Sequence, residues 1–587
     1  MPARLLLRYL RRYASWYLAG LGFLLLATVF ALAIPWMVKS AIEALQAGRG
    51  ARELGWYVAA IFVLAGAHGL VRLGSRLTIY RSGHQIEFDL RNDLYGHLQT
   101  LPPAFFQAHS TGDLMSRASN DLSAVRNLVG FGAVSLISTT LAFVGTLIAM
   151  LAIDPWLTVY AMTPFPLLIL LAKRFNAVIH LRSQAVQDQL GCLSAKVQEN
   201  LAGAEVVRAY TMEAREMAEF GGLNGELLRR SLALARTQAG FSPLVGVISG
   251  MGTLLILWLG GKAVVDGRIS LGAFVAFNGY LAHLAWPTIA LGWTLTILRR
   301  GLSAMERIGA IMAVEPEIRD IGPVSELDSG AGAIPAQTPG AAVEFKNLTF
   351  AYSGRFPALR QLNLAIPAGS TVAIVGPTGS GKSTLGLLIP RLFDPPPGTV
   401  FLDGCDVRSI RLTALRTAVG YVPQESFLFS RSLRENLALA GEHVGEADVL
   451  RAGELAGLAD EVQELPERWE TVVGERGLTL SGGQRQRAAL ARALLRDPRV
   501  LILDDVFASV DAAKEGEILK ALKEVFARRT VLLITHRLRV AQETDWVAVL
   551  DEGRIVERGT HAELLASGGL YARLWRVQQL EDELSRA

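Results

Sequence analysis

Long apolar stretches alternate with long charged stretches over roughly the first 300 residues of the chain. A helix that crosses a bilayer needs about 20 consecutive, mostly apolar residues. Six stretches meet or approach this length, and they are residues 16–38, 54–77, 134–153, 156–172, 241–265 and 273–298. The pattern therefore predicts six membrane-spanning helices.

The segments between the predicted spans differ in length. The connections 154–155 and 266–272 are short, whereas 78–133 and 173–240 are long, charged and compatible with helix. Because a helix rises about 1.5 Å per residue, ~20 residues would carry a span some 30 Å beyond the bilayer. We expect the two long segments to form helical extensions into the cytoplasm.

Each long segment contains an interruption. The first, at 101–121, includes Pro102 and Pro103, and the second surrounds residues 198–210. Structureless loops as long as these segments are uncommon. We therefore expect a short helix at each turnaround, which forms a tip able to press on a neighbouring domain.

Basic residues precede the first predicted span. Arg4, Arg8, Arg11 and Arg12 alternate with apolar residues, as in an amphipathic helix that lies on the inner leaflet. Arginines beside a span favour the cytoplasmic side, and an even number of spans returns the chain to that side. We expect a multi-pass protein of the cytoplasmic (inner) membrane with both termini in the cytoplasm.

The pattern changes after residue 314. Residues 315–340 are rich in glycine, proline, alanine and acidic residues and show no apolar periodicity, which indicates a linker. From residue 341 onward, predicted strands alternate with predicted helices, which is typical of an α/β domain. The sequence thus predicts a helical membrane domain over 1–314 and an α/β domain over 341–587.

Composition narrows the possible classes of function. The chain has 51% hydrophobic and 19% charged residues and a mean hydropathy of +0.32, which is high for a soluble protein. Its net charge of +4 gives no general nucleic-acid footprint. Cys192 and Cys405 are too far apart in the sequence to indicate a metal or disulfide framework.

The strongest motif is GPTGSGKST, which follows a strand-like apolar run and precedes the helical run LGLLIPRLF. It fits the G-x-x-x-x-G-K-S pattern of a phosphate-binding loop in the context that this loop requires. Backbone N–H groups of such a loop bind phosphate oxygens. The lysine neutralises the β- and γ-phosphates, and the serine hydroxyl binds Mg²⁺. We expect ATP to bind Gly376, Thr378, Gly379, Ser380, Gly381, Lys382, Ser383 and Thr384.

Further positions complete a candidate ATPase site. Asp504 ends the apolar run LILD and is expected to bind the same Mg²⁺. The adjacent Asp505 stands where an acid would orient the attacking water. Gln424 is expected to reach the metal and the water, and His536 to reach the γ-phosphate. Tyr352 can stack on adenine.

The segment LSGGQRQR, from Leu480 to Arg487, completes an ordered set of motifs. Together with GPTGSGKST, Gln424, LILDD, SVD and His536, it resembles the nucleotide-binding domain of ATP-binding cassette (ABC) transporters. The six spans and two long internal segments resemble the exporter branch, in which a half-transporter fuses its membrane and ATPase domains. The resemblance covers essentially the whole chain.

The resemblance implies a head-to-tail dimer in which each ATP lies between two chains. One chain supplies the phosphate loop, and the other supplies its LSGGQ segment. The residues that would face the partner's nucleotide are Leu480, Ser481, Gly482, Gly483, Gln484 and Asp511. The short helices at the two interruptions would be coupling helices, which transmit closure of the ATPase pair to the spans.

The implied function is ATP-driven export of hydrophobic or amphipathic compounds, drugs or lipids, by alternating access. Peptide export, a homodimeric exporter with slow hydrolysis and a nucleotide-gated channel or regulator remain alternatives, because a fold does not fix a function. His283 lies deep in the last predicted span. With Asn278, Tyr280 and Trp286 it is our candidate for a substrate path.

Asp505 predicts an asymmetric assembly. Aspartate is one methylene, about 1.5 Å, shorter than glutamate, and a misplacement of ~1 Å can slow catalysis about 10²-fold. The LSGGQ segment is intact and serves the opposite nucleotide. We therefore predict a heterodimer in which a different chain supplies a catalytic glutamate. This chain's own site would bind ATP and hydrolyse it slowly.

Overall fold

The computed structural model describes residues 2–320, 340–352, 356–441, 444–477 and 479–584. The chain divides into two compact units. Unit 1 comprises Met1–Gln99 and Ser110–Val314, and unit 2 comprises Thr100–His109 and Glu315–Ala587. Most of the predicted linker, residues 321–339, lies outside the described residues.

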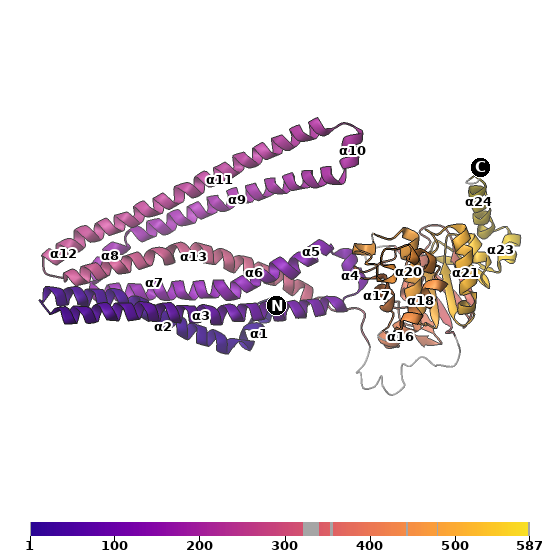
Figure 1. The fold of residues 1–587 in the computed structure, drawn as a ribbon, viewed down its shortest axis with the longest axis horizontal. Coiled ribbons are helices and arrows are strands. Elements are labelled where there is room, and N and C mark those ends of the chain that lie inside the picture. Colours follow the sequence, from indigo (N-terminus) through magenta and orange to yellow (C-terminus); the bar gives the residue numbers. More distant parts are fainter. Residues whose placement is uncertain (1, 321–339, 353–355, 442–443, 478, 585–587) are drawn as a thin grey trace. The chain divides into compact units, whose positions relative to one another are not determined.

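Unit 1 is built of long helices (Figure 1). In chain order they are α1 (Pro2–Arg12), α2 (Ala14–Gln46), α3 (Ala51–Thr100, its last residue falling in unit 2), α5 (Thr111–Ser116), α6 (Leu122–Asn127), α7 (Ala133–Ile153), α8 (Pro155–Met162), α9 (Pro164–Ala202), α10 (Ala204–Ala209), α11 (Glu213–Leu255), α12 (Gly261–Val265) and α13 (Leu271–Met312). Short π-helical stretches lie at Arg117–Asp121, Leu128–Gly132 and Ile256–Gly260.

Side-chain caps set where the short connections of unit 1 end. The carboxylate of Asp154 accepts a hydrogen bond from the backbone N of Leu157 (2.9 Å), and Pro155 occupies the first turn of α8. The hydroxyl of Ser270 accepts from the backbone N of Ala273 (3.0 Å) at the start of α13. Such caps satisfy donors that a helix start leaves unpaired, so the chain can reverse within a few residues.

One apolar core of unit 1 is formed by α7, α8, α13 and the π-helical stretch at Ile256–Gly260. Met150, Phe277 and Leu284 are fully buried there. Close packing also uses a small residue at the start of α13, where a Cβ added to Gly272 would lie 2.5 Å from the carbonyl oxygen of Lys39. In a bilayer no hydrophobic effect drives helices together, because lipid tails are as apolar as the side chains. Close packing around small residues therefore helps membrane helices to associate.

Helices α9 and α11 form a long antiparallel hairpin joined by α10 (Figure 1). The Nζ of Lys196 lies 2.6 Å from a carboxylate oxygen of Glu216 and 2.8 Å from one of Glu219, and these ion pairs tie the two helices together. Large apolar side chains of the hairpin are nevertheless exposed, and they include Leu181, Leu190, Leu201, Met217, Leu228 and Leu232. Exposed apolar surfaces of this kind mark sites where another protein chain binds.

The predicted count of six spans is only partly reflected in the structure. Among the described residues, four stretches are long and apolar enough to cross a membrane: Ala14–Gln46, Ala51–Thr100, Thr111–Ile153 and Gly246–Val265. The predicted span at 156–172 is divided at Thr163 between α8 and α9. The one at 273–298 lies in α13, whose apolar stretch Leu271–Leu284 is shorter. The chain is thus a multi-pass membrane protein, and the number six stays a prediction.

A short helix occupies each predicted interruption, as expected. The first is α4 (Pro103–Ala108), which belongs to unit 2; Ala104 packs against the apolar core of that unit, and Phe105 is buried. The second is α10, in which Val206 is exposed, and exposed Tyr210 follows it directly. The helical tips are confirmed, whereas the surface that each tip contacts in the assembled protein stays a prediction.

Unit 2 contains two sheets. Their strands are β1 (Val343–Phe350), β2 (Leu359–Ile366), β3 (Thr371–Val375), β4 (Val400–Leu402), β5 (Cys405–Asp406), β6 (Val419–Val422), β7 (Val500–Asp504), β8 (Thr530–Ile534), β9 (Trp546–Asp551) and β10 (Arg554–Gly559). The four-stranded sheet, β2-β1-β4-β5, is antiparallel, with Val343 opposite Ile366 and Leu402. The six-stranded sheet, β10-β9-β3-β8-β7-β6, is parallel except at β10.

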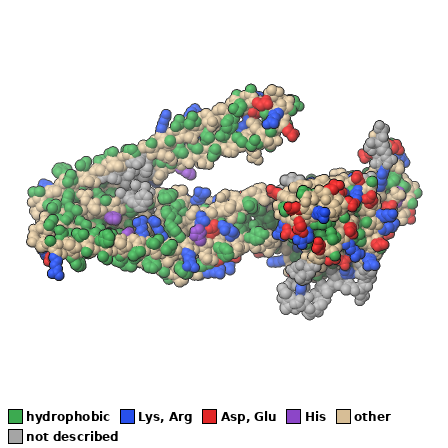
Figure 2. All heavy atoms as spheres, in the orientation of Figure 1, with side chains coloured by type: hydrophobic (Ala, Val, Ile, Leu, Met, Phe, Trp, Pro, Cys, Tyr) green, Lys and Arg blue, Asp and Glu red, His purple; other side chains and the backbone are tan. Residues whose placement is uncertain are grey.

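Helices surround the sheets of unit 2 (Figure 1). They are α15 (Lys382–Leu388), α16 (Leu412–Ala418), α17 (Leu433–Ala438), α18 (Glu446–Leu455), α19 (Ala459–Gln463), α20 (Gly482–Leu495), α21 (Ala512–Phe526), α22 (Leu538–Gln542), α23 (His561–Ser567) and α24 (Leu570–Leu584). Figure 2 shows charged side chains of both signs spread over this unit, and hydrophobic side chains gathered along the helices of unit 1.

The parallel sheet determines where the candidate chemistry lies. Strands β7 and β8 are buried along their whole length, and β3 nearly so. Apolar side chains such as Ile374, Ile502 and Ile534 pack in one core beside them. Parallel strands present their carboxyl ends at one edge, and ligands of open α/β sheets bind there. Gly376, Asp505 and His536 follow β3, β7 and β8 at this edge.

Candidate nucleotide-binding and hydrolysis site

The loop after β3 can be built only with glycine at two positions. Gly376 has a φ of 149° and Gly381 a φ of 104°, both in a region that L-residues rarely adopt. A Cβ would lie 2.0 Å from the carbonyl oxygen of Leu550 at the first position and 2.6 Å from that of Ala358 at the second. Other residues would both strain and obstruct the loop, so its geometry explains the glycines of the motif.

Lys382 turns its ammonium group back into this loop. It is the first residue of α15 and is 5% exposed. Its Nζ donates to the carbonyl oxygens of Gly376 (2.9 Å) and Pro377 (2.8 Å). Burial lowers the pKa of the ammonium group, and the carboxylates of Asp504 and Asp505 oppose that shift. The loop therefore holds a cation, and a lysine in a phosphate-binding loop neutralises phosphate oxygens.

Oxygen atoms converge beside the lysine. The hydroxyl of Ser383 donates to Oδ1 of Asp504 (3.0 Å), and the hydroxyl of Tyr421 donates to Oδ2 (3.3 Å). Burial raises the pKa of Asp504, and the two hydrogen bonds oppose the shift. Mg²⁺ prefers oxygen ligands such as a carboxylate and a hydroxyl, so these side chains fit the ion. Gln424 is exposed just beyond β6. Its main-chain carbonyl oxygen accepts a hydrogen bond from Nε2 of Gln486 (3.3 Å).

Asp505 and His536 lie at adjacent strand ends. Asp505 is 9% exposed, and its backbone N donates to the carbonyl oxygen of Ile534 (2.7 Å) with a φ of 50°. Burial lowers the pKa of His536; the nearby charge of Lys382 adds to this, and Asp505 opposes it. The shift favours the neutral imidazole, which can donate one hydrogen bond and accept another. Lys382, Asp505 and His536 thus share one electrostatic environment.

Tyr352 is placed at the side of this loop. Its hydroxyl donates to Oγ1 of Thr384 (3.1 Å), and its ring contacts Phe393 edge to face, with 5.0 Å between centroids. The ring is half-buried. The proposed stacking on adenine stays a prediction.

The LSGGQ segment forms the start of α20. Ser481 caps the helix by accepting from the backbone N of Gln484 (3.2 Å), whose side chain accepts from the backbone N of Ser481 (2.9 Å). A Cβ on Gly483 would lie 2.7 Å from the carbonyl oxygen of Ser509, so the loop between β7 and α21 lies close to the start of α20. Asp511 caps α21, accepting from the backbone N of Lys514 (2.7 Å). Ser481 and Asp511 therefore lie at the starts of α20 and α21, whereas Lys382 lies at the start of α15. A site shared between two chains requires such separate segments.

The candidate substrate path is less coherent in the structure. Tyr280 is 1% exposed, and its hydroxyl donates to the carbonyl oxygen of Leu32 (2.7 Å), so it packs within the helical core rather than lining an open path. Asn278 is half-buried and His283 is exposed. The side chain of Trp286 lies outside those described. The role of the remaining residues stays a prediction.

Sequence reasoning missed residues whose contacts only the fold reveals. Tyr421, Gln486 and Arg537 donate hydrogen bonds to Asp504, Gln424 and the loop 508–510, respectively. Each lies within three residues of a recognised motif position. Closeness to a motif was the only feature of the sequence that could have indicated these three residues. Their residue types alone do not indicate a role in the site.

Fold and site together define a membrane protein with a fused phosphate-loop ATPase unit. The chain matches the family model of the ABC transporter transmembrane region over residues 17–288 and the ABC transporter family model over residues 359–508. It is 33% identical to the probable multidrug resistance ABC transporter ATP-binding/permease protein YheI of Bacillus subtilis over 97% of both chains. It is also 33% identical to the ATP-dependent lipid A-core flippase of Syntrophus aciditrophicus, over 99% of this chain and 95% of that protein.

Other relatives agree. Multidrug resistance-like ATP-binding protein MdlA of Escherichia coli is 32% identical over 99% of this chain and 97% of its own. A solved structure of a bacterial Atm1-family ABC exporter with ATP bound has a TM-score of 0.75 and 27% identity, covering 97% of this chain and 98% of that one. The chain belongs to the ABC transporter family and has the exporter fold. It is an ATP-binding ATPase and translocase, as its sequence predicted.

Replacing Lys382 by alanine should greatly weaken nucleotide binding at this chain's own phosphate loop. Hydrogen bonds to charged groups contribute about 1.5–3 kcal/mol each, so we expect a loss of roughly 10- to 100-fold in ATP affinity. Equilibrium binding of a fluorescent ATP analogue to the full chain measures this. Lys520→Ala, an exposed lysine on α21, is the matched control. Unchanged affinity in Lys382→Ala would contradict the assignment of this loop.

Replacing Tyr421 by phenylalanine should shift the pH dependence of ATP hydrolysis. The hydroxyl of Tyr421 helps to keep the pKa of the Asp504 carboxyl from rising, so its removal raises that pKa further. Because the carboxylate form is required, activity should be lost at a higher pH than in the unmodified protein as the solution is acidified. The rate above pH 8 should change little. An unshifted acidic limb would show that this contact has no influence on Asp504.

Proposed function

We propose that this chain is one half of an exporter that moves hydrophobic or amphipathic compounds, drugs or lipids, out of the cytoplasmic membrane by alternating access. One observation carries the proposal: a phosphate-loop ATPase unit is fused to a unit of long apolar helices in a single chain. Relatives named as a multidrug resistance transporter and a lipid A-core flippase support both substrate classes.

The same proposal includes the organisation of the chain. Residues 1–314 form the membrane domain with six spans, 315–340 the linker and 341–587 the ATPase domain. Basic residues of α1 favour a cytoplasmic N-terminus, and an even number of spans returns the ATPase domain to the same side. Mg²⁺ would be held by Ser383, Asp504 and Gln424, and when bound it neutralises phosphate charge.

Two features support a dimer. The start of α20, with its first-turn N–H groups and the cap of Ser481, can bind an anion, and it lies on a segment distinct from the Lys382 loop. A second chain would bring its own phosphate loop to this helix start. The hairpin of α9 and α11 exposes large apolar side chains, which a second membrane unit would cover.

Coupling between the domains is proposed to use the two short helices. Unit 2 carries a hollow of about 420 Å³ lined in part by Phe427, Phe429 and Leu439, and each of these side chains is more than two-fifths exposed. An exposed aromatic residue, Tyr210, follows α10 at the tip of the hairpin. We propose that α10 of one chain docks in the corresponding hollow of the other chain, while α4 serves its own ATPase domain.

A cross-linking experiment tests the docking of α10. Cys192 and Cys405 are first replaced by alanine, then Tyr210→Cys is placed in this chain and a second cysteine at the hollow of the partner, at the position matching Leu439. We expect an oxidised two-chain product whose yield changes on addition of ATP. Leu181→Cys, exposed on α9 away from the tip, is the matched control and should give no such product. Only ATP-insensitive aggregates from Tyr210→Cys would count against the docking.

The position of Asp505 supports a slow site in this chain. Its backbone N is held by the carbonyl oxygen of Ile534, and its side chain is buried. A carboxylate one methylene short therefore cannot move forward by a shift of the backbone without breaking that hydrogen bond. We propose that a different chain supplies the glutamate of the active site, which the LSGGQ segment of this chain completes.

Three alternatives remain beside this assignment. A homodimer with two slow sites is favoured by the general symmetry of oligomers. Peptide export uses the same architecture with another substrate. A nucleotide-gated channel or regulator would bind ATP without substrate-stimulated turnover, so ATPase activity stimulated by a transported compound separates it from an exporter.

Substitutions decide between the heterodimer and the homodimer. The chain is expressed alone and with its genomic neighbour, and ATP turnover is measured in both. Asp505→Ala should leave most activity of the pair, because this residue serves the slow site. Ser481→Ala should abolish activity, because it serves the nucleotide bound by the partner. Full turnover by the chain alone that Asp505→Ala eliminates would defeat the heterodimer and establish the homodimer.

A further inference from the structure

The loop between β7 and α21 is held by side chains from outside it. Residues 508–510 belong to neither a strand nor a helix. The carbonyl oxygen of Ala508 accepts from Nη2 of Arg537 (3.0 Å), and that of Val510 accepts from Nη1 (2.8 Å). Between them, the backbone N of Ser509 donates to Oε1 of Gln486 (3.2 Å). Three successive backbone groups are therefore fixed by two side chains.

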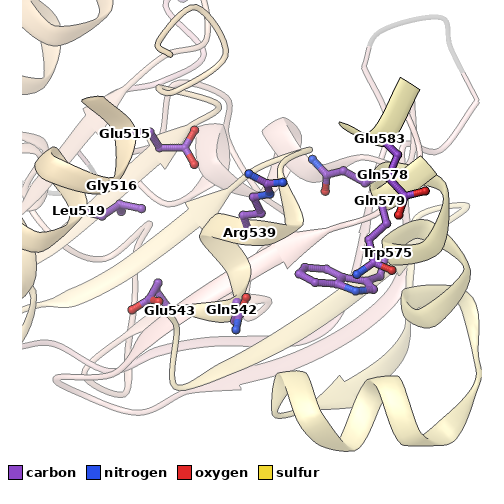
Figure 3. Close-up of a pocket in the computed structure, with 10 residues that line it drawn as sticks. All are labelled: Glu515, Gly516, Leu519, Arg539, Gln542, Glu543, Trp575, Gln578, Gln579 and Glu583. Atoms are coloured by element: carbon purple, nitrogen blue, oxygen red, sulfur yellow. The ribbon is translucent and has the colours of Figure 1, made fainter. Parts of the chain in front are cut away.

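Arg537 is itself firmly anchored. Its Nη1 also forms an ion pair with Glu515, a buried residue of α21. Its backbone N donates to Oγ1 of Thr535 (2.9 Å), and the next backbone N, of Leu538, donates to Oε1 of Gln578 (2.8 Å) on α24. Residues of α21, α22 and α24 line a pocket of about 520 Å³. Figure 3 shows Glu515 and Gln578 on opposite sides of this pocket. Arg537 is thus held by Glu515 of α21, and the next residue, Leu538, is held by Gln578 of α24.

Gln486 is placed to act with Arg537. It lies in the first two turns of α20, five residues after Ser481, and is 6% exposed. Its side-chain amide uses both ends, since Nε2 donates to the carbonyl oxygen of Gln424 (3.3 Å) and Oε1 accepts from Ser509. One buried amide therefore connects the loop after β6, the LSGGQ helix and the loop 508–510.

We propose that Arg537 and Gln486 are positioning residues for ATP hydrolysis. The loop that they hold begins at Asp505, the candidate water-orienting acid, and ends at Asp511, which caps α21. Fixing residues 508–510 fixes the direction in which both carboxylates leave the backbone. Arg537 directly follows His536, so a displacement of the histidine loop moves residues 508–510 as well. In the heterodimer of the proposed function the loss of turnover rests on Asp511, which faces the nucleotide of the partner, whereas in a homodimer the displacement of Asp505 lowers turnover directly.

The guanidinium group suits this role better than other cations. Its planar fork presents several N–H donors in fixed directions, which allows one side chain to bind two carbonyl oxygens and a carboxylate. A lysine is a point charge on a flexible stem and cannot hold three acceptors in the same geometry. Arg537→Lys should therefore keep the charge beside Glu515 but lose the position of the loop.

Kinetics of the full chain test the proposal, in whichever assembly turns over ATP. A misplacement of ~1 Å can cost about 10²-fold in rate. We expect Arg537→Gln and Arg537→Lys to lower kcat at least about tenfold, and Gln486→Met to lower it by a smaller factor. The Kd for ATP should stay within about twofold, because the phosphate loop is untouched. Arg528→Gln, an exposed arginine just after α21, is the matched control for loss of charge.

Hydrogen–deuterium exchange supplies a readout that does not depend on activity. The backbone amides of residues 505–511 should exchange faster in Arg537→Gln, whereas those of residues 376–384 should not change. Unaltered exchange at 505–511, or a kcat for Arg537→Lys equal to that of the unmodified chain, would overturn the proposal. So would a parallel loss of ATP affinity and thermal stability, which indicates a purely structural role. Failure of the export proposal would leave both readouts intact.

Discussion

A lysine and two carboxylates are taken out of water together at one edge of the parallel sheet. A single buried charge costs several kcal/mol, and removing one partner of such a group leaves the other charge uncompensated. Burial lowers the pKa of Lys382 and raises that of Asp504, so each charged form depends on its neighbours. The rigid ends of β3 and β7 keep these groups close, and the glycine loop supplies further backbone partners. The nucleotide site therefore depends on this shared desolvation.

Hydrogen bonds extend this site in two directions. Ser383 and Tyr421 bind the Asp504 carboxylate from α15 and β6. On the other side, Arg537 and Gln486 hold the loop that leaves Asp505. The side chains that surround Lys382, Asp504 and Asp505 thus belong to strands and helices that pack in the apolar core. Through Gln486 these hydrogen bonds extend as far as the LSGGQ helix.

The membrane unit follows a different rule. Its described ion pairs include the buried Glu87 of α3, which pairs with Arg91 (2.7 Å) and Arg126 (3.1 Å), and Lys196 with Glu216 in the hairpin. A backbone in lipid must satisfy its own hydrogen bonds, so long helices are the available solution. The exposed apolar surface of α9 and α11 is consistent with burial by lipid or a second chain. Stability of this unit is therefore tied to its surroundings.

The sequence by itself determined the order of the two domains, the phosphate loop and the ATPase class. These depend on local patterns: apolar stretches long enough for spans, and glycines whose positive φ angles the loop requires. Asp504 and His536 were proposed from their positions after apolar runs, and the structure places both at the carboxyl ends of parallel strands. The short helix α4 could be predicted because Pro102 and Pro103 interrupt a long helical segment, and α10 because a structureless loop at the second turnaround would be uncommon.

Only the tertiary structure decided which distant residues meet. Tyr421 reaches Asp504 because β6 pairs with β7, and Arg537 reaches the loop 508–510 because β8 lies beside β7. Tyr280, predicted for a substrate path, packs in the core because its hydroxyl finds the backbone of α2. The span at 156–172 is divided at Thr163, which hydropathy alone does not register. Such outcomes depend on contacts between segments far apart in the chain, and a one-dimensional pattern contains no record of those contacts.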